Sequence, residues 1–157
     1  MRRWAARRLA AATAALAAFA LPACGSHTLR TGPRVAPTLE ADVAAVRAAV
    51  GAFVTGESAG DARVDTLLAR TSDFVVDGVV LVHRPRLAGV PGPGAGAVTD
   101  LQIELAGDWA WAVAGYVWVG DDPAGAERGL ATFVLQREPA GWRIRHVHSS
   151  HVERWSH

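Results

Sequence analysis

The chain is poor in cysteine, lysine and tyrosine. Cys24 is its one cysteine, so no disulfide can form within the chain and the folded part must be held together by packing. All of its basic side chains are arginine, and Tyr116 is its one tyrosine. No apolar run reaches the roughly 20 residues that a helix needs to cross a bilayer. With 157 residues, the chain has room for one domain.

The N-terminus combines positive charge with an apolar run. The run extends from Leu9 to Leu21 without a charged residue. A signal-peptide core needs about 7–15 apolar residues behind a basic segment. Residues 1–23 are therefore predicted to be an export signal that takes no part in the fold. The basic segment consists of Arg2, Arg3, Arg7 and Arg8.

The run ends in Leu21, Pro22, Ala23 and Cys24, which resemble the lipobox of bacterial lipoproteins. The resemblance implies that Cys24 is lipidated and becomes the new N-terminus, although Pro22 departs from the small or β-branched residue usual at its position. We expect an exported protein of the cell envelope, anchored to a membrane through Cys24, with residues 24–37 as a flexible tether. The alternative is an ordinary signal peptide cleaved near Ala23, which leaves a free thiol.

Removal of the export signal changes the charge balance. The formal net charge of the whole chain is +1, and loss of four arginines and no acids makes it about −3. The sequence shows no basic patch, so nucleic acid is not an expected partner. Nothing in the sequence predicts a cofactor.

Residues 38–157 are predicted to form the domain, and they begin with helical patterns. Thr38 can cap a helix that extends from Leu39 to Thr55, with Val46, Val50 and Phe53 on its apolar side. Gly56 and Gly60 are expected to end this helix. A short second helix is predicted over 61–70.

The rest of the domain has the patterns of β-strands. Apolar alternation, β-branched residues and aromatic residues predict strands, and Gly-rich or Asp-Gly turns separate them. The predicted class is α+β, with N-terminal helices packed in a curved, mainly antiparallel sheet. The predicted strands are 73–76, 79–83, 98–105, 109–119, 130–137 and 142–152.

The C-terminal strands carry the most specific pattern. Trp142, Ile144, His148 and Ser150 fit the motif Trp-x-Ile-x-x-x-His-x-Ser. With the preceding strand and its Gly turn, this resembles the SnoaL-like, nuclear-transport-factor-like superfamily. The resemblance implies a cystatin-like α+β cone with a pocket at its open end. It also implies a homodimer that forms through the sheet.

Strand alternation predicts which side chains reach the pocket. Residues with the same parity as Trp142 and Ile144 lie on one face, which we assign to the inside. This places His146, His148 and Ser150 at the polar end of that face, where they would bind a ligand. Trp111 and Tyr116 are further candidates for ligand binding, but both faces of the strand 109–119 are apolar and its pattern does not identify the inner one.

Three functions fit these residues. The first is binding of a small apolar ligand in the pocket. The second is an isomerase-, cyclase- or dehydratase-like enzyme with His148 as the acid-base, since the usual pKa of histidine lies near neutrality. The third is a dimeric structural or protein-interaction module. A zinc site at His146 and His148 lacks further ligands in the sequence, so no metal is expected.

Overall fold

The computed structural model describes residues 38–84, 86–122 and 125–152. Its first element is the helix α1, Leu39–Ser58, and Thr38 caps it as predicted, since the Thr38 hydroxyl accepts a hydrogen bond from the Ala41 N–H at 3.2 Å. The predicted end at Thr55 is wrong by three residues. Gly56 stays within the helix, beside Val64 of the following segment.

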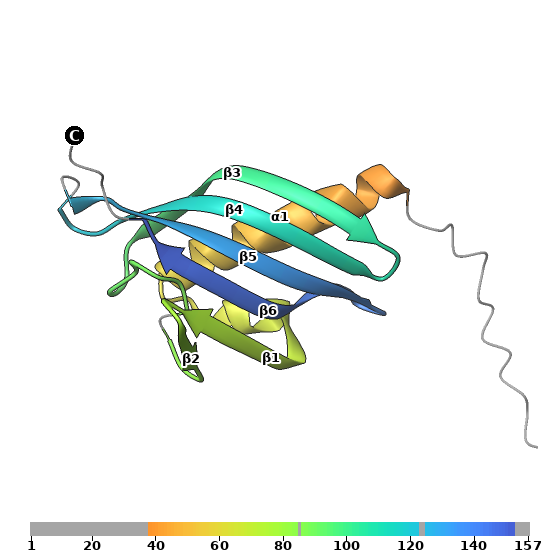
Figure 1. Cartoon of the computed structure of the whole chain (residues 1–157), viewed down its shortest axis with the longest axis horizontal. Helices are drawn as coiled ribbons and strands as arrows, with labels where there is room; N and C mark the ends of the chain where they lie inside the picture. Colours follow the sequence, from red (N-terminus) through yellow and green to blue (C-terminus); the bar gives the residue numbers. More distant parts are fainter. Residues whose placement is uncertain (1–37, 85, 123–124, 153–157) are drawn as a thin grey trace, which may run out of the picture. The chain divides into compact units, whose positions relative to one another are not determined.

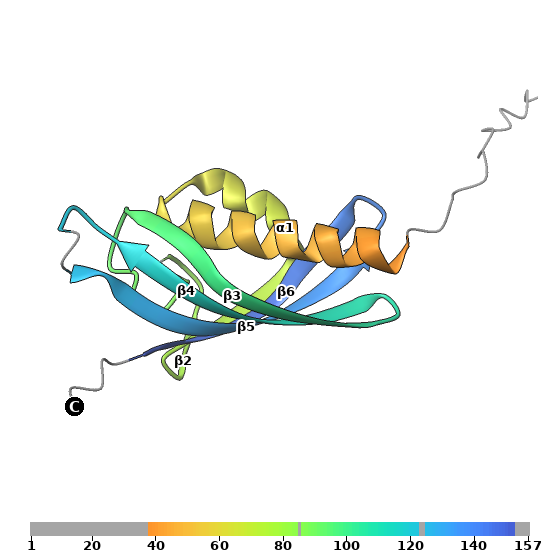
Figure 2. The ribbon, with the colours of Figure 1, turned by 90° about the horizontal axis from the view of Figure 1, so that it is seen from above.

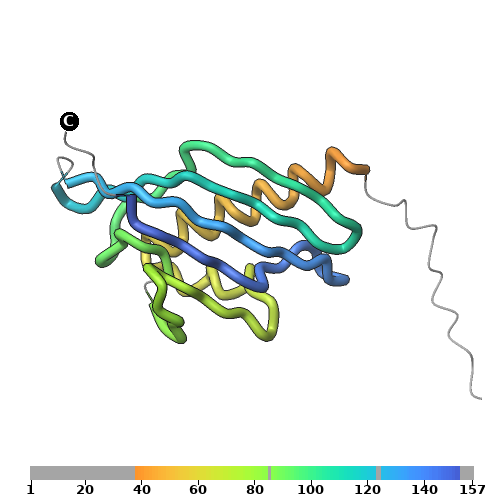
Figure 3. The backbone as a smooth tube through the Cα atoms, viewed as in Figure 1, coloured from red at the N-terminus to blue at the C-terminus, as the bar shows by residue number. Residues whose placement is uncertain are grey.

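One six-stranded sheet makes up most of the rest of the domain, in the order β2-β1-β6-β5-β4-β3 (Figure 1). Most neighbours run antiparallel, and β1 and β6 run parallel. The tube in Figure 3 shows β1, near the start of the domain, beside the last strand. The predicted α+β class with a mainly antiparallel sheet is confirmed. The strands are β1 Leu68–Val76, β2 Val79–Leu81, β3 Ala95–Ala106, β4 Trp109–Val119, β5 Glu127–Glu138 and β6 Gly141–His151.

The predicted second helix is only partly present. A 3-10 helix, η1, covers Ala62–Leu67, and β1 begins directly after it. Leu68 already pairs with Ile144 of β6. The pairing with a strand from the far end of the domain therefore overrides the local helical pattern, as tertiary contacts often do.

The helix α1 lies across one face of the sheet, and the sheet bends around it (Figure 2). The strand β4 shows which face this is. Ala110, Ala112 and Ala114 are fully buried, whereas Trp109 and Trp111 are 37% and 43% exposed. The even-numbered residues of β4 thus face inward, and Trp109 and Trp111 lie on the outer face.

A β-bulge in β6 reverses the alternation of its side chains. Leu135 of β5 pairs with Ile144 and Val134 pairs with His146, so Arg145 is an extra residue without a partner on β5. A bulge of one residue shifts the inward positions from even to odd numbers. Beyond Ile144, the buried side chains are accordingly Val147 and Ser149.

The first half of β6 packs as predicted. Trp142 and Ile144 are buried in the same hydrophobic cluster as Val46, Val50 and Phe53 of α1. The start of α1 is also held to the β5–β6 hairpin by polar contacts that involve Trp142, whose indole N–H donates to Asp42 at 3.3 Å. None of the described helices is long and apolar enough to cross a membrane.

Candidate functional site

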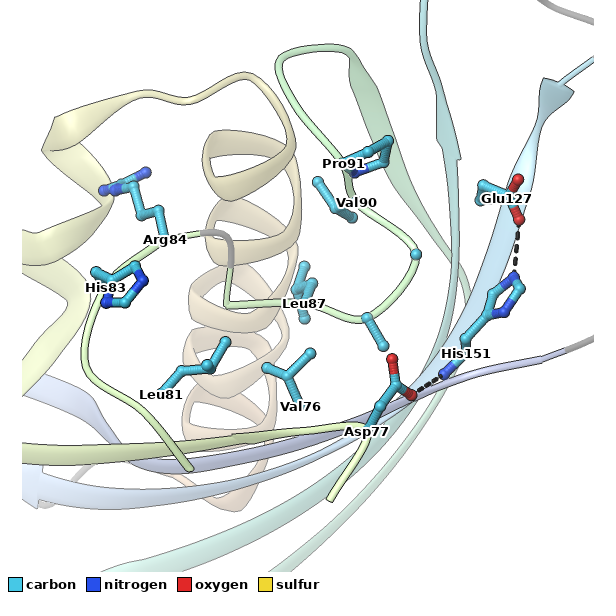
Figure 4. Close-up of a pocket in the computed structure, with 12 residues that line it drawn as sticks. Val76, Asp77, Leu81, His83, Arg84, Leu87, Val90, Pro91, Glu127 and His151 are labelled. Atoms are coloured by element: carbon cyan, nitrogen blue, oxygen red, sulfur yellow. Dashed lines mark hydrogen bonds and ion pairs between the residues drawn. The ribbon is translucent and has the colours of Figure 1, made fainter. Parts of the chain in front are cut away.

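An open groove of about 490 Å³ lies where β6 ends and β5 begins (Figure 4). Its walls come from the β1–β2 hairpin, the connection between β2 and β3, and the adjoining ends of β5 and β6. The side chains around it are apolar toward the interior and polar at the rim. The apolar ones are Val76, Leu81, Leu87, Val90 and Pro91, and the polar ones are Asp77, His83, Arg84, Glu127 and His151.

The turn between β1 and β2 places Asp77 at the rim. Asp77 and Gly78 have positive φ angles of 47° and 80°, which is typical of the tight Asp-Gly hairpin turn that the sequence predicts. The Asp77 N–H donates to the Ser149 carbonyl at 3.0 Å, and a carboxylate oxygen of Asp77 accepts from the His151 N–H at 2.8 Å. These two bonds fix the turn against the end of β6.

His151 and Glu127 form a side-chain pair at the rim. Nε2 of His151 lies 2.8 Å from Oε2 of Glu127, and both side chains are about 40% exposed. If Nε2 carries the proton that bonds to Glu127, Nδ1 is left as the accepting nitrogen. A histidine held in this way by a carboxylate can act as a hydrogen-bonding group or as a general base.

The segment Arg86–Val90 forms the inner wall of the groove. Leu87 and Ala88 are each 1% exposed, so this connection lies inside the fold. Gly89 allows it to approach the end of β6 closely: its φ is +67°, and an added Cβ would lie 3.0 Å from the His151 ring.

A buried ion pair holds this segment to α1. The guanidinium of Arg86 donates to Glu57 at 2.8 Å, and the Arg86 N–H donates to the other carboxylate oxygen at 2.9 Å. Burial by itself lowers the pKa of Arg86, but its hydrogen bonds to Glu57 and Asp65 outweigh that effect and raise the pKa overall. The guanidinium also lies 4.8 Å from the ring centre of Phe74.

Two strand side chains bind the backbone of Ala88. Its N–H donates to the Ser149 hydroxyl at 3.0 Å, and its carbonyl accepts from the Tyr116 hydroxyl at 2.6 Å. Burial raises the pKa of Tyr116 to about 12, and hydrogen bonds to Ser149 and Ala88 act in the opposite direction. Tyr116 is therefore neutral and donates a hydrogen bond at physiological pH.

The structure does not bring the predicted ligand-binding residues of β6 to this groove. His146, His148 and Ser150 lie beyond the bulge on the outer face, so the expectation that they share the inward face of Trp142 is wrong. His148 and Ser150 are exposed, and His146 lies 2.6 Å from Asp73 on β1. The extra residue Arg145 is the physical reason for this difference.

The two aromatic candidates of β4 have opposite surroundings. Trp111 is 43% exposed on the outer face of the sheet, away from α1. Tyr116 is 2% exposed and its hydroxyl contacts the inner wall of the groove. Only Tyr116 lies beside the groove among the five residues predicted to bind a ligand.

The sequence signals for the groove residues were weak. His151 has the opposite parity to His148 in an unbroken strand, so alternation assigned it to the outside. Asp77 has the sequence pattern of a turn residue, and Glu127 stands at the start of a strand without a motif around it. The Asp-Gly turn and the Gly- and Pro-rich stretch that follows 84 were the signals that could have pointed to this end of the sheet.

Within the described part of the chain, no group of three or more His, Cys, Asp or Glu side chains is arranged to hold a metal ion. At the rim, Asp77 and Glu127 are both bonded to His151, and Arg84 is paired with Glu57 and Asp65. The site therefore offers hydrogen bonds, an arginine, two histidines (His83 and His151) and an apolar wall.

Comparisons with known proteins agree with this architecture. Residues 76–153 match the model of the SnoaL-like domain. No curated protein matches the sequence. Among solved structures, an NTF2-like protein with a cystatin-like fold from Novosphingobium aromaticivorans superposes with a TM-score of 0.60 at 17% identity, over 73% of this chain and 84% of that one.

Two further structures have the same fold. A protein of unknown function from Mycobacterium tuberculosis gives a TM-score of 0.59 at 20% identity, over 72% of this chain and 73% of that one. A candidate dehydratase of the NTF2-like family from Streptomyces avermitilis gives 0.57 at 22% identity, over 74% of this chain and all of that one. Residues 76–153 are thus similar to SnoaL-like domains, and the described fold is the cystatin-like fold of NTF2-like proteins.

Proposed function

We propose that the domain binds a small, mainly apolar ligand in the groove between the β1–β2 hairpin and the ends of β5 and β6. The observation that carries this proposal is the combination of a volume of about 490 Å³ with an apolar wall and a few polar groups at the rim. Sites for small molecules typically have volumes of about 300–1,000 Å³ and this distribution of polarity. His151, held by Glu127, would accept or donate the hydrogen bond that orients the ligand.

Binding of a fluorescent apolar dye, 1-anilinonaphthalene-8-sulfonate, tests the groove. Leu81 lines it from β2, so Leu81→Glu should weaken dye binding at least tenfold. Val80→Glu is the matched control, because Val80 is the next residue on the same strand, is 70% exposed and does not line the groove. Equal affinities of the two variants, with circular dichroism unchanged, would contradict the proposal.

Acid-base catalysis is the second candidate function, and the His151–Glu127 pair favours it. His148 is not beside the groove, so the role proposed for it passes to His151. A histidine beside an apolar groove could remove a proton next to a carbonyl group and return it elsewhere. Its carboxylate partner would orient the ring and stabilise the charged imidazolium.

Deuterium uptake from D₂O into 2-tetralone, an apolar ketone with acidic C–H bonds, tests this activity. The wild type should accelerate the uptake over buffer, and His151→Asn should abolish the acceleration. His148→Asn is the matched control and should retain it. A wild-type rate equal to that of buffer, or equal losses in both variants, would reject this acid-base activity.

We also propose that the outer face of the sheet forms a homodimer. It carries a band of half-exposed apolar side chains: Trp109, Trp111, Val113 and Leu130. Apolar bands of this kind commonly mark interfaces. Trp111→Glu should shift the mass measured by light scattering from dimer to monomer, whereas Val82→Glu, on the β2 side, should not.

Export and anchoring through Cys24 remain part of the proposal. Residues 1–37, which include the predicted signal and tether, lie outside the described residues. Their support is the sequence pattern that ends in Cys24. Labelled palmitate should be incorporated into the wild type in a bacterial host and not into Cys24→Ser, and absence of label from both would reject the anchor.

A further inference from the structure

The segment Arg86–Val90 is bound by the fold in the way that a protein binds a peptide. Ala88 presents its N–H to the Ser149 hydroxyl and its carbonyl to the Tyr116 hydroxyl, at 3.0 and 2.6 Å. These partners come from β6 and β4, and both side chains are almost completely buried. A connecting segment on a protein surface would satisfy these groups with water or with its own turn. Here two side chains from strands bind both backbone groups of a single residue, Ala88.

The side chains of the segment on either side of Ala88 occupy the apolar interior. Leu87 and Val90 are 1% and 3% exposed and belong to the hydrophobic core. Arg86 is held by Glu57 of α1 at the inner end. Side-chain pockets around two backbone hydrogen bonds are the usual elements of peptide recognition.

The same segment separates the groove from the interior. Its residues Leu87 to Val90 line the groove (Figure 4), and Tyr116 and Ser149 lie behind them. The segment is a connection between β2 and β3 and belongs to no strand of the sheet. Its displacement would leave every strand pairing of the sheet intact and would open the groove toward α1, and local openings of this kind require less free energy than global unfolding.

We propose that the interior behind the groove is a second binding site, for a short peptide, and that the segment Arg86–Val90 occupies it as an internal ligand. The expected ligand has an apolar residue followed by a small residue, in the manner of Leu87 and Ala88. Ser149 accepts a hydrogen bond from the N–H of the small residue, and Tyr116 donates one to its carbonyl. This site is distinct from the groove proposed above, which would accept apolar molecules without any displacement.

The test uses the full chain and a labelled acetyl-Arg-Leu-Ala-Gly-Val-amide peptide, which copies residues 86–90. Leu87→Ala removes apolar contacts of the internal segment and so weakens its binding to the interior. The variant leaves Tyr116, Ser149 and the Arg86–Glu57 pair in place. Fluorescence anisotropy should then detect binding of the peptide at least tenfold tighter to this variant than to the wild type. The same peptide methylated on its alanine nitrogen should bind at least tenfold more weakly, because it lacks the hydrogen that Ser149 accepts.

Two results would overturn the proposal. One is equal affinity of the parent and the N-methylated peptides, and the other is no binding to a natively folded Leu87→Ala protein at millimolar peptide. If Leu87→Ala does not fold, hydrogen exchange of the wild type decides. The Ala88 amide should exchange through a local opening, at a rate that low urea does not accelerate. Exchange of this amide only by global unfolding, as expected for Ala112 of β4, would also overturn the proposal.

Discussion

The two ends of α1 carry similar polar clusters with different surroundings. At its start, Asp42 accepts two hydrogen bonds from Arg137, whose guanidinium lies 4.5 Å from the Trp142 ring centre. Near its end, Glu57 is paired with Arg86, whose guanidinium lies over Phe74. Each is a carboxylate of α1, an arginine of another element and an aromatic ring, and the carboxylates are about 22 Å apart along the helix.

The elements that carry the two arginines differ in how far they are fixed by contacts other than the ion pair. Arg137 belongs to β5, which pairs with a neighbour on each side. Arg86 belongs to a connection outside the sheet, and its side chain is 8% exposed, against 27% for that of Arg137. The first cluster thus adds to an arrangement that the sheet already fixes, whereas the second keeps a connecting segment inside the fold, beside the groove.

The largest expected effect comes from Glu57→Ala. The variant leaves the Arg86 charge buried without its main partner, and removal of one partner of a buried pair typically costs about 3–5 kcal/mol. Urea unfolding at pH 7 measures the loss. Asp65→Asn, which changes the exposed partner of Arg86, should have a much smaller effect. A loss for Glu57→Ala no larger than for Asp65→Asn would mean that the pair does not hold the segment.

Tyr116 should make the stability of the fold sensitive to alkaline pH. Its pKa rises from 10 in the unfolded chain to about 12 in the fold, so its stabilising contribution is complete below pH 10 and is lost as the pH rises to 12. The loss is on the order of 2–3 kcal/mol over that range. The chain has no lysine and no other tyrosine, so no other side chain of these two types titrates in this pH range.

Urea unfolding of Tyr116→Phe between pH 9 and 12 checks this prediction. The variant should be less stable than the wild type at neutral pH, because the Ala88 carbonyl loses its donor, and its stability should fall less steeply above pH 10. Parallel curves for the two proteins would show that the Tyr116 hydroxyl is not buried as described.

A smaller effect is expected at the start of α1. Trp142→Phe removes the indole N–H that donates to Asp42 and part of the ring beneath Arg137. Loss of one hydrogen bond and some buried area should reduce the free energy of unfolding by about 1–2 kcal/mol. Trp111→Phe, at a half-exposed position, should stay within about 0.5 kcal/mol of the wild type. Equal losses at the two positions would contradict the burial of Trp142.

The smallest effect concerns acid pH. The hydrogen bonds from Arg137 lower the pKa of Asp42 below its usual value of 3.8. A lowered pKa in the fold means that the contribution to stability is present above about pH 4 and is lost as the pH falls further. Asp42→Asn should therefore flatten the decline of the melting temperature between pH 4 and 2.5. Asp121→Asn, in an exposed loop, should leave the slope unchanged.

Much of the fold could be predicted because it depends on local patterns. Thr38 and the spacing of Val46, Val50 and Phe53 predicted α1, and the Asp77-Gly78 turn predicted the first hairpin. The start of β1 could not be predicted, since residues 68–72 become a strand only by pairing with β6 at the other end of the domain. The candidate site was predicted poorly for the same reason, because it combines segments that are distant in the sequence.

The class of the fold, the order of its elements and the burial of Trp142 and Ile144 follow from the amino-acid pattern, because periodicity and turn chemistry act over a few residues. The inner face of β4 and the direction of the β6 histidines depend instead on contacts between distant segments. Side chains alternate along a strand, so the one extra residue at Arg145 moves His148 to the outer face. Pairing with β5 fixes that bulge, and so His151, not His148, reaches the groove.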